Sequence, residues 1–413
     1  MKRISLFLLL FLLLKATVMY SQDGHPETNF RIVPVSPNAA SLGTFGMIPT
    51  DNYVGQANLT IPIYEIDLDG KKFPIALSYH TDGTRVAQEA TWIGLGWTLQ
   101  AGGCVVRQVQ GTDDFAARGC YNLTDAPWLT NPRFEVTDQN LEKYMGYFKG
   151  DYDAEPDMFY FNAGGHSGSM YFDVLKNNRQ LNAVPTIQTQ EKVVKMVYNT
   201  SNKTWTMTDL EGYVYSFSTK EITYYFLNTI DFFQTDITRS HIFPYYNEPQ
   251  IVTAWMLDSV TSPNGGKITF SYKKESIFTP ISTTEDVISL SKIVNGQLSS
   301  QSPQYFTNKF NYNYSYSKIE QWTLSAITFE GGKVEFGTTD REDIESAETG
   351  KKVQKLSSIK VSDTAGNLIK TTMLEYKYLL SGMAATTNGY DDRLLLSKVY
   401  DVAGSKNMIY LIQ

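Results

Sequence analysis

The sequence has 413 residues and a formal net charge of −7, and 13% of its residues are aromatic and 19% charged. This length allows about two to three domains with a large core, and the low charged share excludes a coiled coil or a disordered chain. An acidic surface repels phosphate backbones, so we expect no nucleic-acid partner. The many aromatic residues favour strands over helices.

Residues 1–21 have the pattern of a secretory signal peptide. Lys2 and Arg3 precede an apolar run over residues 4–14, and the chain turns polar at Ser21. A charged start before a short apolar core is typical of such leaders, and this run is too short to span a bilayer comfortably. We therefore expect export, no membrane span after signal removal, and a secreted or cell-surface location.

Residues 22–55 contain many proline, glycine, serine and asparagine residues, which predicts an extended, irregular lead-in. Residues 56–275 contain runs of alternating apolar and polar residues, which predicts an N-terminal β domain. In its first strand the apolar positions change parity near Pro62, and this indicates a β-bulge in an edge strand. Asp69 and Gly70 then predict a tight turn and a hairpin.

The second half contains a degenerate repeat. Residues 257–270 combine a Leu, an apolar residue three positions later, a glycine turn and an apolar-x-Phe strand, and residues 324–336 repeat this closely. Looser copies begin at Leu356 and Leu396. Such a hairpin cannot bury its apolar face alone, so neighbouring copies must pair or stack. We expect a growing, curved sheet of hairpins.

Residues 276–318 are rich in serine, threonine, glutamine and asparagine, which predicts a polar loop or domain junction. Residues 319–413 form the predicted hairpin-repeat region. Its last copy stops at residues 410–413 with an open strand edge, so we expect a chain truncated at its C-terminus. The predicted fold class is all-β, with antiparallel hairpins in a β-sandwich or in curved, open shell sheets. Little helix is expected, with one short candidate near residues 141–145.

The stretch from residue 73 to residue 103 is expected to organise the fold. An alternating strand leads to Trp92 and Trp97, which bracket Gly94 and Gly96. Trp is large and apolar, whereas Gly permits a positive φ or the close approach of another backbone. The combination predicts a packed corner where one sheet folds over another, and Gly96→Val should abolish soluble expression. The expected structural residues are Trp92, Gly94, Gly96, Trp97, Gly102, Gly103 and Arg107.

Several motifs together resemble the N-terminal region of Bacteroidetes RHS/YD-repeat proteins. They are residues 36–43, 61–64, 74–79, 92–97 and 102–103 with Arg107, then 155–159 with Gly168, 209–217, 255–272 and 341–343. The order of Ser-Tyr, Gly-Leu-Gly-Trp and Arg is also distantly similar to the SpvB-type shell domain of toxin complexes. The tyrosine-aspartate repeats themselves are absent from this sequence.

The resemblance implies a large secreted or surface protein in which β-hairpins wind into a hollow shell around a C-terminal effector. The function it implies is a non-enzymatic structural shell or scaffold, which displays or delivers a toxin in interbacterial competition or surface interaction. The partner it implies is a C-terminal RHS/toxin portion, missing from this chain or encoded nearby.

No set of residues predicts catalysis, a cofactor or a metal ion. The four histidines are His25, His80, His166 and His241, and none is spaced from another histidine or cysteine as metal ligands are. Residues 165–168 (Gly-His-Ser-Gly) resemble a nucleophile elbow, but that motif needs a glycine two positions after its serine, where this chain has Ser169. The segment also joins two predicted strands, so a hairpin turn is favoured around His166. His80 alternates with the apolar residues of its strand, which indicates a surface side chain.

Acidic residues gather in three places. They are residues 113–114, residues 391–392, and the set Asp151, Asp153, Glu155 and Asp157. Such carboxylates could bind calcium or form the acid and base of a glycosidase. Solvated turns are favoured, because Asp suits turns on its own and the set lacks the glycine and terminal glutamate of a calcium loop.

Two alternatives stay open. The alternative function is a carbohydrate-binding or glycan-cleaving surface protein that uses exposed Trp128 or Trp205, with a surface glycan or protein as its partner. The second alternative concerns Cys104 and Cys120, the only cysteines. In an exported chain they can form one disulfide, or remain two buried thiols that pack as small hydrophobes.

Overall fold

The computed structural model describes residues 33–47, 59–79, 88–111, 113–116, 119–122, 153, 155–173, 182–188, 194–230, 239–244, 250–290, 293–294, 297–298, 307–379, 392–403 and 406–411. Outside them lie the predicted signal peptide, the helix expected near residues 141–145, and His25, His80, Trp128, Asp151 and Asp391. The chain divides into a smaller unit of residues 1–32, 109–156 and 173–177, and a larger unit formed by the rest. The described residues of the smaller unit include one short 3-10 helix, η2 (Cys120–Asn122).

The described part of the larger unit is built mostly of antiparallel strands, which confirms the predicted all-β class. A small sheet contains β1 (Leu59–Leu68), β2 (Lys71–Tyr79) and β3 (Trp97–Gln100). The first strands of the large sheet are β4 (Gly103–Gln108), β5 (Met158–Ala163), β6 (His166–Tyr171), β7 (Asn182–Ala183), β8 (Thr186–Ile187), β9 (Val194–Asn199), β10 (Thr204–Asp209), β11 (Val214–Ile230) and β12 (Phe243–Pro244). Its later strands are β13 (Ile251–Thr261), β14 (Lys267–Phe278), β15 (Ser282–Leu290), β18 (Thr307–Phe329), β19 (Gly332–Asp340), β20 (Gln354–Ser362), β21 (Leu368–Leu379), β22 (Arg393–Ala403) and β23 (Lys406–Leu411). The short strands β16 (Ile293–Val294) and β17 (Gln297–Leu298) pair with each other.

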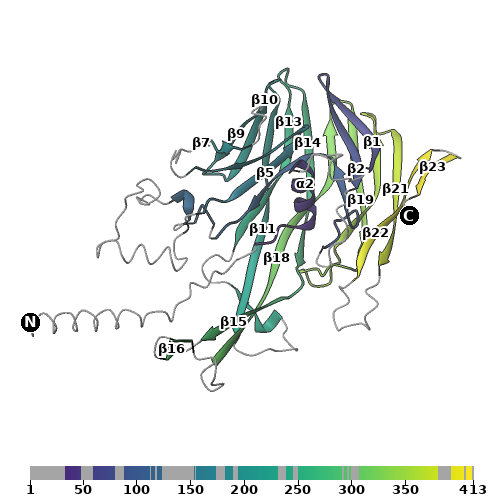
Figure 1. Cartoon of the computed structure of the whole chain (residues 1–413). Coiled ribbons are helices and arrows are strands. Elements are labelled where there is room, and N and C mark those ends of the chain that lie inside the picture. Colours follow the sequence, from purple (N-terminus) through teal and green to yellow (C-terminus); the bar gives the residue numbers. More distant parts are fainter. Residues whose placement is uncertain are drawn as a thin grey trace, which may run out of the picture. The chain divides into compact units, whose positions relative to one another are not determined.

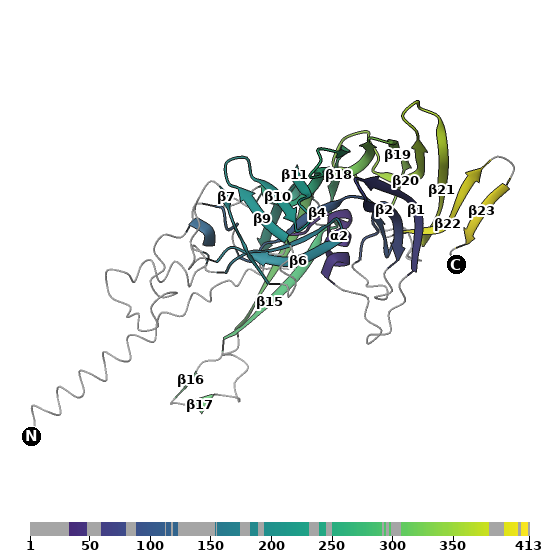
Figure 2. The same cartoon turned by 90° about the horizontal axis from the view of Figure 1, so that it is seen from above.

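The β1–β2 hairpin follows the sequence prediction. Its turn is formed by Asp69 and Gly70, with φ angles of +50° and +92°. The register shifts between Pro62 and Tyr64, which is the bulge that the parity change predicts. The small sheet packs against the large one, where the ring of Tyr64 lies 6.2 Å from that of Phe329 in β18. Figure 2 shows β1 and β2 beside β19 and β20 of the large sheet.

Two long strands, β11 and β18, connect the parts of the large sheet (Figure 1). β11 pairs with β13 along its first half and with β18 along its second half. β18 has 23 residues and pairs in turn with β15, β11 and β14. β13 and β14 pair only beside their turn, and then β13 joins β4 whereas β14 joins β18. β13 and β14 therefore diverge beyond their turn and leave an opening between them, although the pairings of the large sheet close into a barrel through β11, β13, β14 and β18.

Helix α2 (Pro37–Met47) covers this opening, and Ala39 packs there with Cys104 of β4. The helix corrects the expectation of an irregular lead-in over residues 22–55. Its start has a local cause: Ser36 Oγ accepts the N–H of Ala39 (3.2 Å), and Pro37 stands where a missing N–H costs nothing. A second short helix is η3 (Arg239–His241). No helix among the described residues has the length and apolarity needed to cross a membrane.

The repeat copies are paired hairpins, as the sequence predicts. Residues 257–270 lie in the β13–β14 hairpin, and residues 324–336 lie in the β18–β19 hairpin. The copies that begin at Leu356 and Leu396 lie in the β20–β21 and β22–β23 hairpins. The strands from β18 to β23 are neighbours in chain order, so each hairpin extends the sheet formed by the one before it.

The described residues of the stretch 276–318 lie mostly in strands, which corrects the expectation of a polar loop. β14 continues to Phe278, and β15 pairs with β18 from Ser282 and Ser315 to Leu290 and Thr307. Threonine and tyrosine are common in this stretch, and both suit a pleated strand even where no apolar alternation marks it. The high share of serine and asparagine conceals this pairing in the sequence.

Candidate functional site

Residues 92–97 form the junction segment, which hydrogen-bonds to the end of the large sheet. β20 pairs with β21 only from Ser358 onward. At Leu356 the N–H donates instead to the carbonyl of Trp92 (2.9 Å), and the N–H of Leu95 donates to the carbonyl of Leu394 in β22 (2.8 Å). The last residue of the segment, Trp97, begins β3 of the small sheet. The segment therefore joins the two sheets.

Gly94 and Gly96 both adopt the positive φ that the sequence analysis expects, and Gly94 also allows the close approach of another backbone. Their φ angles are +116° and +76°, in a region that residues with a Cβ rarely adopt. A Cβ added to Gly94 would also lie 2.8 Å from the backbone nitrogen of Leu396 in β22. Gly94 is therefore required for both the turn and the close approach of another strand, whereas Gly96 is required for the turn.

The two tryptophans pack on different sheets. Trp97 lies beside Tyr79 of β2, with ring centroids 5.2 Å apart, and Trp92 lies 6.4 Å from Phe336 of β19. Both indoles are buried. Aromatic pairs of this kind stabilise by about 0.5–1.5 kcal/mol beyond the area that they bury. The predicted corner, in which one sheet folds over another, is present in the structure.

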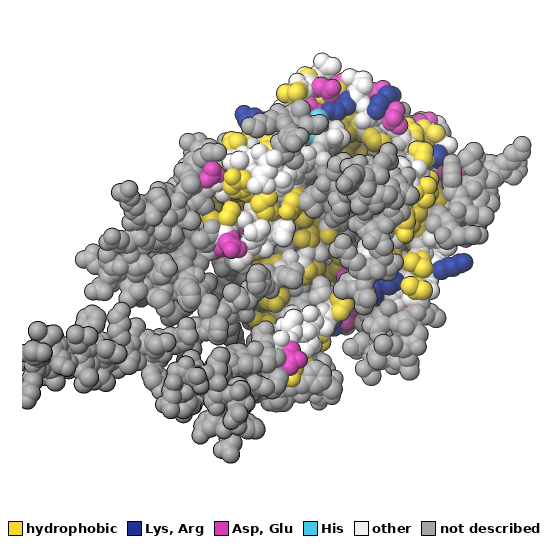
Figure 3. Space-filling view, viewed as in Figure 1, with side chains coloured by type: hydrophobic (Ala, Val, Ile, Leu, Met, Phe, Trp, Pro, Cys, Tyr) yellow, Lys and Arg dark blue, Asp and Glu magenta, His cyan; other side chains and the backbone are white. Residues whose placement is uncertain are grey.

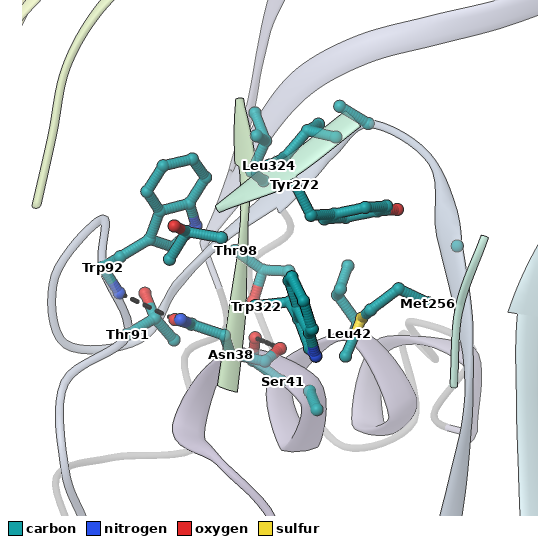
Figure 4. A pocket seen from close by; sticks show the side chains of 15 residues that line it. Asn38, Ser41, Leu42, Thr91, Trp92, Thr98, Met256, Tyr272, Trp322 and Leu324 are labelled. Atoms are coloured by element: carbon teal, nitrogen blue, oxygen red, sulfur yellow. Dashed lines mark hydrogen bonds between the residues drawn. The ribbon is translucent and has the colours of Figure 1, made fainter. Parts of the chain in front are cut away.

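Two polar side chains that the sequence did not single out hold the backbone of the junction segment. Thr91 Oγ1 donates to the carbonyl of Trp97 (2.7 Å) and accepts the N–H of Ile93 (3.2 Å). Asn38 in α2 accepts the N–H of Trp92 (2.9 Å), drawn as a dashed line in Figure 4. The one available signal for Asn38 is its place in the motif at residues 36–43, which carries the family resemblance.

A buried ion pair fastens the start of the junction segment to the large sheet. Arg341 Nε and Nη2 donate to the two carboxylate oxygens of Asp343 (2.8 and 2.7 Å). The same guanidinium donates to the carbonyls of Thr91 (3.0 Å) and Ala90 (3.2 Å), and Asp343 accepts the N–H of Leu394 (3.1 Å). These charge-assisted bonds offset the cost of removing both charges from water.

Arg107 makes a second buried ion pair. Its Nε donates to Oδ2 of Asp157 (2.8 Å), and both side chains are almost fully buried. The guanidinium carbon lies 5.6 Å from the centre of the Phe159 ring in β5. Nearby, a Cβ at Gly103 would clash with the backbone of β5, and Gly102 has a φ of +113°. Asp157 of the predicted acidic set is therefore bound to a guanidinium.

A polar cluster connects β2 to the turn between β10 and β11. Lys71 Nζ lies 2.5 Å from Asp209 Oδ2 and 3.0 Å from Glu211 Oε2. Tyr215 donates its hydroxyl to Asp209 Oδ2 (3.1 Å), and His166 Nε2 lies 3.8 Å from the same oxygen. Among the described residues, this cluster has the mixture of groups that most resembles a catalytic site.

The pKa shifts in this cluster favour a structural role, in which the charged groups hold strands together, over a catalytic one. Burial raises the pKa of Tyr215. Burial lowers the pKa of Lys71, but its hydrogen bonds to Asp209 and Glu211 outweigh that effect and raise it. Burial raises the pKa of Asp209, but the ammonium of Lys71 and the hydrogen bonds from Tyr213 and Tyr215 together outweigh burial and lower it. A lysine or tyrosine that acts as a nucleophile or general base is helped by a lowered pKa, and the pKa values of Lys71 and Tyr215 are both raised.

Two other acidic residues, Asp153 and Asp113, stabilise local turns. Asp153 Oδ1 accepts the N–H of Glu155 (2.9 Å), and Asp113 Oδ1 accepts the N–H of Phe115 (2.8 Å). Among the described residues, no three His, Cys, Asp or Glu side chains gather in a way that could hold a metal ion.

Basic and acidic side chains are interspersed on the face shown in Figure 3. Charges of both signs gather at its upper end, and hydrophobic side chains occupy much of its middle. The described side chains on this face therefore form no broad basic patch of the kind that binds phosphate backbones.

A cavity of about 40 Å³ lies between α2, the junction segment and the large sheet (Figure 4). Its lining includes Asn38, Trp92, Met256, Tyr272 and Trp322. Binding pockets for small molecules start at about 300 Å³, whereas a cavity of about 15 Å³ can hold a water molecule. The cavity has room for water rather than for a substrate.

Trp205 and Cys104 are both core residues. Trp205 is 1% exposed and packs against the rings of Phe159, Tyr198 and Trp255, so it cannot stack on a sugar in the way the alternative function requires. Cys104 and Cys120 are each buried thiols. Burial raises the pKa of Cys104, which makes it unreactive.

No family model and no curated protein matches the chain. Among solved structures, the chain is similar to the Photorhabdus luminescens Tc holotoxin pore, with a TM-score of 0.39 and 10% identity over 84% of this chain and 15% of that chain. It is also similar to the N-terminal domain of effector protein SpvB from Salmonella typhimurium strain LT2, with a TM-score of 0.35 and 12% identity over 86% of this chain and 99% of that one.

Proposed function

We propose that this chain is a non-enzymatic scaffold module of an exported RHS/YD-repeat protein, which helps to display or deliver a C-terminal effector. The observation that carries the proposal is the junction segment. Trp92, Gly94 and Trp97 belong to the motifs that carry the family resemblance, and they join two sheets. The residues that we expect to matter most for function are therefore those that fix how the two sheets are joined.

The order of the hairpins supports the same proposal. β18–β19, β20–β21 and β22–β23 are added to one side of the sheet in chain order. Each new hairpin covers the strand edge left by the preceding one. A sheet built in this way can be extended by further hairpins without rearranging those already in place. This property suits a shell that encloses another segment.

The buried ion pairs support a role without chemistry. Arg107 and Arg341 are each bound to a carboxylate, and Lys71 is held by two. Charged groups in these arrangements have fixed partners inside the protein, so they are poorly placed to transfer protons to a substrate. They are well suited to hold strands that are distant in sequence.

Protease protection tests the delivery role. The natural gene product, from Met1 to its own stop codon, is purified together with any protein encoded directly downstream and treated with a nonspecific protease. We expect a C-terminal segment that resists cleavage in the intact protein and is cut after mild unfolding. If nothing C-terminal to Gln413 is encoded or co-purifies, or if that segment is cut at once, the delivery role is wrong.

Glycan binding is tested separately. The same protein is applied to a glycan array and incubated with polysaccharides, and released sugars are measured. We expect neither binding nor release. Specific binding of one glycan class, or sugar release that is lost on substitution of exposed carboxylates, would favour the alternative function over the scaffold.

A further inference from the structure

A second cavity, of about 150 Å³, lies between the small sheet and the large sheet. We call it the inter-sheet pocket. It is larger than the cavity of Figure 4, and its walls are mainly apolar. Three apolar side chains from each sheet form these walls: Ile66, Phe73 and Ile75 from β1 and β2, and Ile268, Phe270 and Ile327 from β14 and β18.

The small sheet supplies one wall of the inter-sheet pocket. Ile66 and Phe73 are direct cross-strand neighbours in β1 and β2, and Ile75 lies two positions further along the same face of β2. The ring of Phe73 also packs near Tyr213 and Tyr215, with centroids 6.4 Å apart in each case. Packing within the protein therefore fixes this wall before any ligand binds.

The large sheet supplies the opposite wall. Phe270 and Ile327 are direct neighbours across β14 and β18, and Ile268 lies two positions before Phe270 on the same face. Ile268 and Phe270 are the apolar-x-Phe pair of the first repeat copy, and Ile327 belongs to the second copy. The repeat therefore supplies apolar side chains to the pocket as well as strands to the sheet.

The pocket is left unfilled because the chain that crosses beside it has almost no side chains. Ala101, Gly102 and Gly103 lead from β3 of the small sheet to β4 of the large sheet, and all three line the pocket. A Cβ at Gly102 would lie 3.4 Å from the ring of Phe270. The missing side chain therefore leaves space beside this ring.

The volume and the lining together select the ligand. Pockets for drug-sized molecules start at about 300 Å³, so the inter-sheet pocket is too small for one. An engineered cavity of about 150 Å³ in another protein, lined by leucine, isoleucine and phenylalanine, stays dry and binds benzene. The inter-sheet pocket has a comparable volume and lining. It therefore fits one aromatic ring better than water.

The rim of the pocket is polar and partly exposed. The four isoleucines of the walls are at most 2% exposed, whereas Gln100 and Asn162 are half-buried and Gly165 is exposed. Asn162 Nδ2 donates to the carbonyl of Leu42 in α2 (3.0 Å), which fixes this side chain. Carboxamides both donate and accept hydrogen bonds, as a peptide group does. The rim can therefore pair with a peptide backbone beside the ring.

We propose that the inter-sheet pocket binds a phenyl-sized side chain of a peptide segment, with its ring between the two sheets and its peptide group at Gln100 and Asn162. The ring gains by leaving water, and the peptide group keeps its hydrogen bonds at the rim. The site does not rest on the proposed scaffold role, because it needs only contacts within this chain. Its failure would leave that role untouched.

Methyl NMR of the full chain, labelled at the isoleucine δ1 carbons, tests the pocket. The probe is N-acetyl-L-phenylalaninamide, whose ring current shifts nearby methyl signals. We expect saturable shifts at the four isoleucines of the walls and none at Ile277 and Ile319, which lie further along β14 and β18 in another cluster. N-acetyl-L-alaninamide, which has no ring, should shift none of them. An absence of saturable shifts with the ring-bearing probe, or equal shifts at all isoleucines, would overturn the pocket.

Gln100→Leu tests the peptide group. It should weaken binding of N-acetyl-L-phenylalaninamide by about 3- to 10-fold, the effect of one lost hydrogen bond, and leave benzene binding unchanged. Gln188→Leu, at an exposed residue after β8, is the matched control and should change neither. If Gln100→Leu leaves both probes unchanged or weakens both equally, the site does not recognise a peptide and the proposal is wrong.

Ile327→Phe tests the location of the ring. The added ring occupies the pocket, so binding of both probes should weaken by about 10-fold or more. A folded Ile327→Phe protein that binds both probes as the unmodified protein does would place the ring elsewhere and overturn the proposal. Overpacking can prevent this variant from folding. In that case the wall isoleucines and Gln100→Leu still decide the outcome.

Discussion

Gly94 lies directly against the backbone of Leu396, although the two residues are 302 positions apart in a chain whose sheet is otherwise assembled from neighbouring hairpins. A Cβ at Gly94 would lie 2.8 Å from the nitrogen of Leu396 and 3.3 Å from the carbonyl oxygen of Leu394. Because both contacts are to backbone, no side-chain rearrangement can relieve them. This contact makes the junction segment a fixed link between the two sheets.

Gly94→Ala should therefore destabilise the protein by about 3 kcal/mol or more, since it adds a backbone clash to the cost of a positive φ. Gly70→Ala is the matched control, because Gly70 also has a positive φ but nothing lies within 4 Å of its added Cβ. We expect Gly70→Ala to cost only about 1 kcal/mol. Urea denaturation of both variants measures the difference, and equal losses would contradict the role of the Leu396 contact.

Gly96→Val tests whether the second glycine of the junction segment is also required. A β-branched residue at a φ of +76° is strained whatever space surrounds it. We expect loss of soluble expression, and the assay is the soluble yield beside Gly70→Val. Normal yield and an unchanged melting temperature would show that the segment can rearrange around this position.

Arg341→Met should cost about 3–5 kcal/mol, because it leaves the carboxylate of Asp343 buried without its guanidinium. The double variant Arg341→Met with Asp343→Asn should recover part of this loss, since no unpaired charge remains. Equilibrium unfolding in urea gives the coupling between the two positions. If the double variant is no more stable than the single one, the guanidinium acts through the Ala90 and Thr91 carbonyls rather than through Asp343.

Lys71→Met should destabilise the protein by about 1–3 kcal/mol at pH 7, because Asp209 is then a buried acceptor with a lost partner. The pKa of Asp209 is lowered in the folded protein, from an ordinary value near 3.8. Its stabilising contribution is thus present above that value and lost as the pH falls through the lowered pKa. The difference in melting temperature between the unmodified protein and Lys71→Met should be large at pH 7 and small near pH 2.5.

Lys72→Met is the control for this comparison. Lys72 is the next residue in β2, but its side chain is 55% exposed and its partner Asp67 is also exposed. Exposed pairs are screened by water and salt, so we expect no measurable change at either pH. A loss as large as that of Lys71→Met would mean that the charge of β2, rather than the contact with Asp209, matters.

Short-range sequence patterns predict the elements that are determined by neighbouring residues. The turn at Asp69 and Gly70, the bulge at Pro62 and the repeated hairpins all follow from alternation and turn chemistry within about 15 residues. Helix α2 is also local in origin, since Ser36 and Pro37 form a cap and a first turn. It was missed because the glycines and prolines around it suggest an irregular chain.

The contacts that define the junction could not be read from the sequence. Arg341 and Thr91 are 250 positions apart, and no pattern within either segment names the other. The strands in the stretch 276–318 were concealed for a different reason: their stability comes from pairing with the long β11 and β18, not from an apolar face of their own. In both cases the information lies in tertiary pairing, which composition does not encode.

Trp205→Ala should destabilise the protein by about 3–5 kcal/mol, because a fully buried indole is replaced by a cavity among Phe159, Tyr198 and Trp255. Trp205→Phe should lose much less, since it keeps an aromatic ring in the same space. The near-ultraviolet circular dichroism signal and the urea midpoint follow both variants, with Lys333→Ala as a control at a position in β19 whose side chain is 44% exposed. A stable Trp205→Ala protein would mean that this cluster is not the core of the β9–β10 region. Glycan binding that depends on Trp205 would, in addition, return the alternative function to consideration.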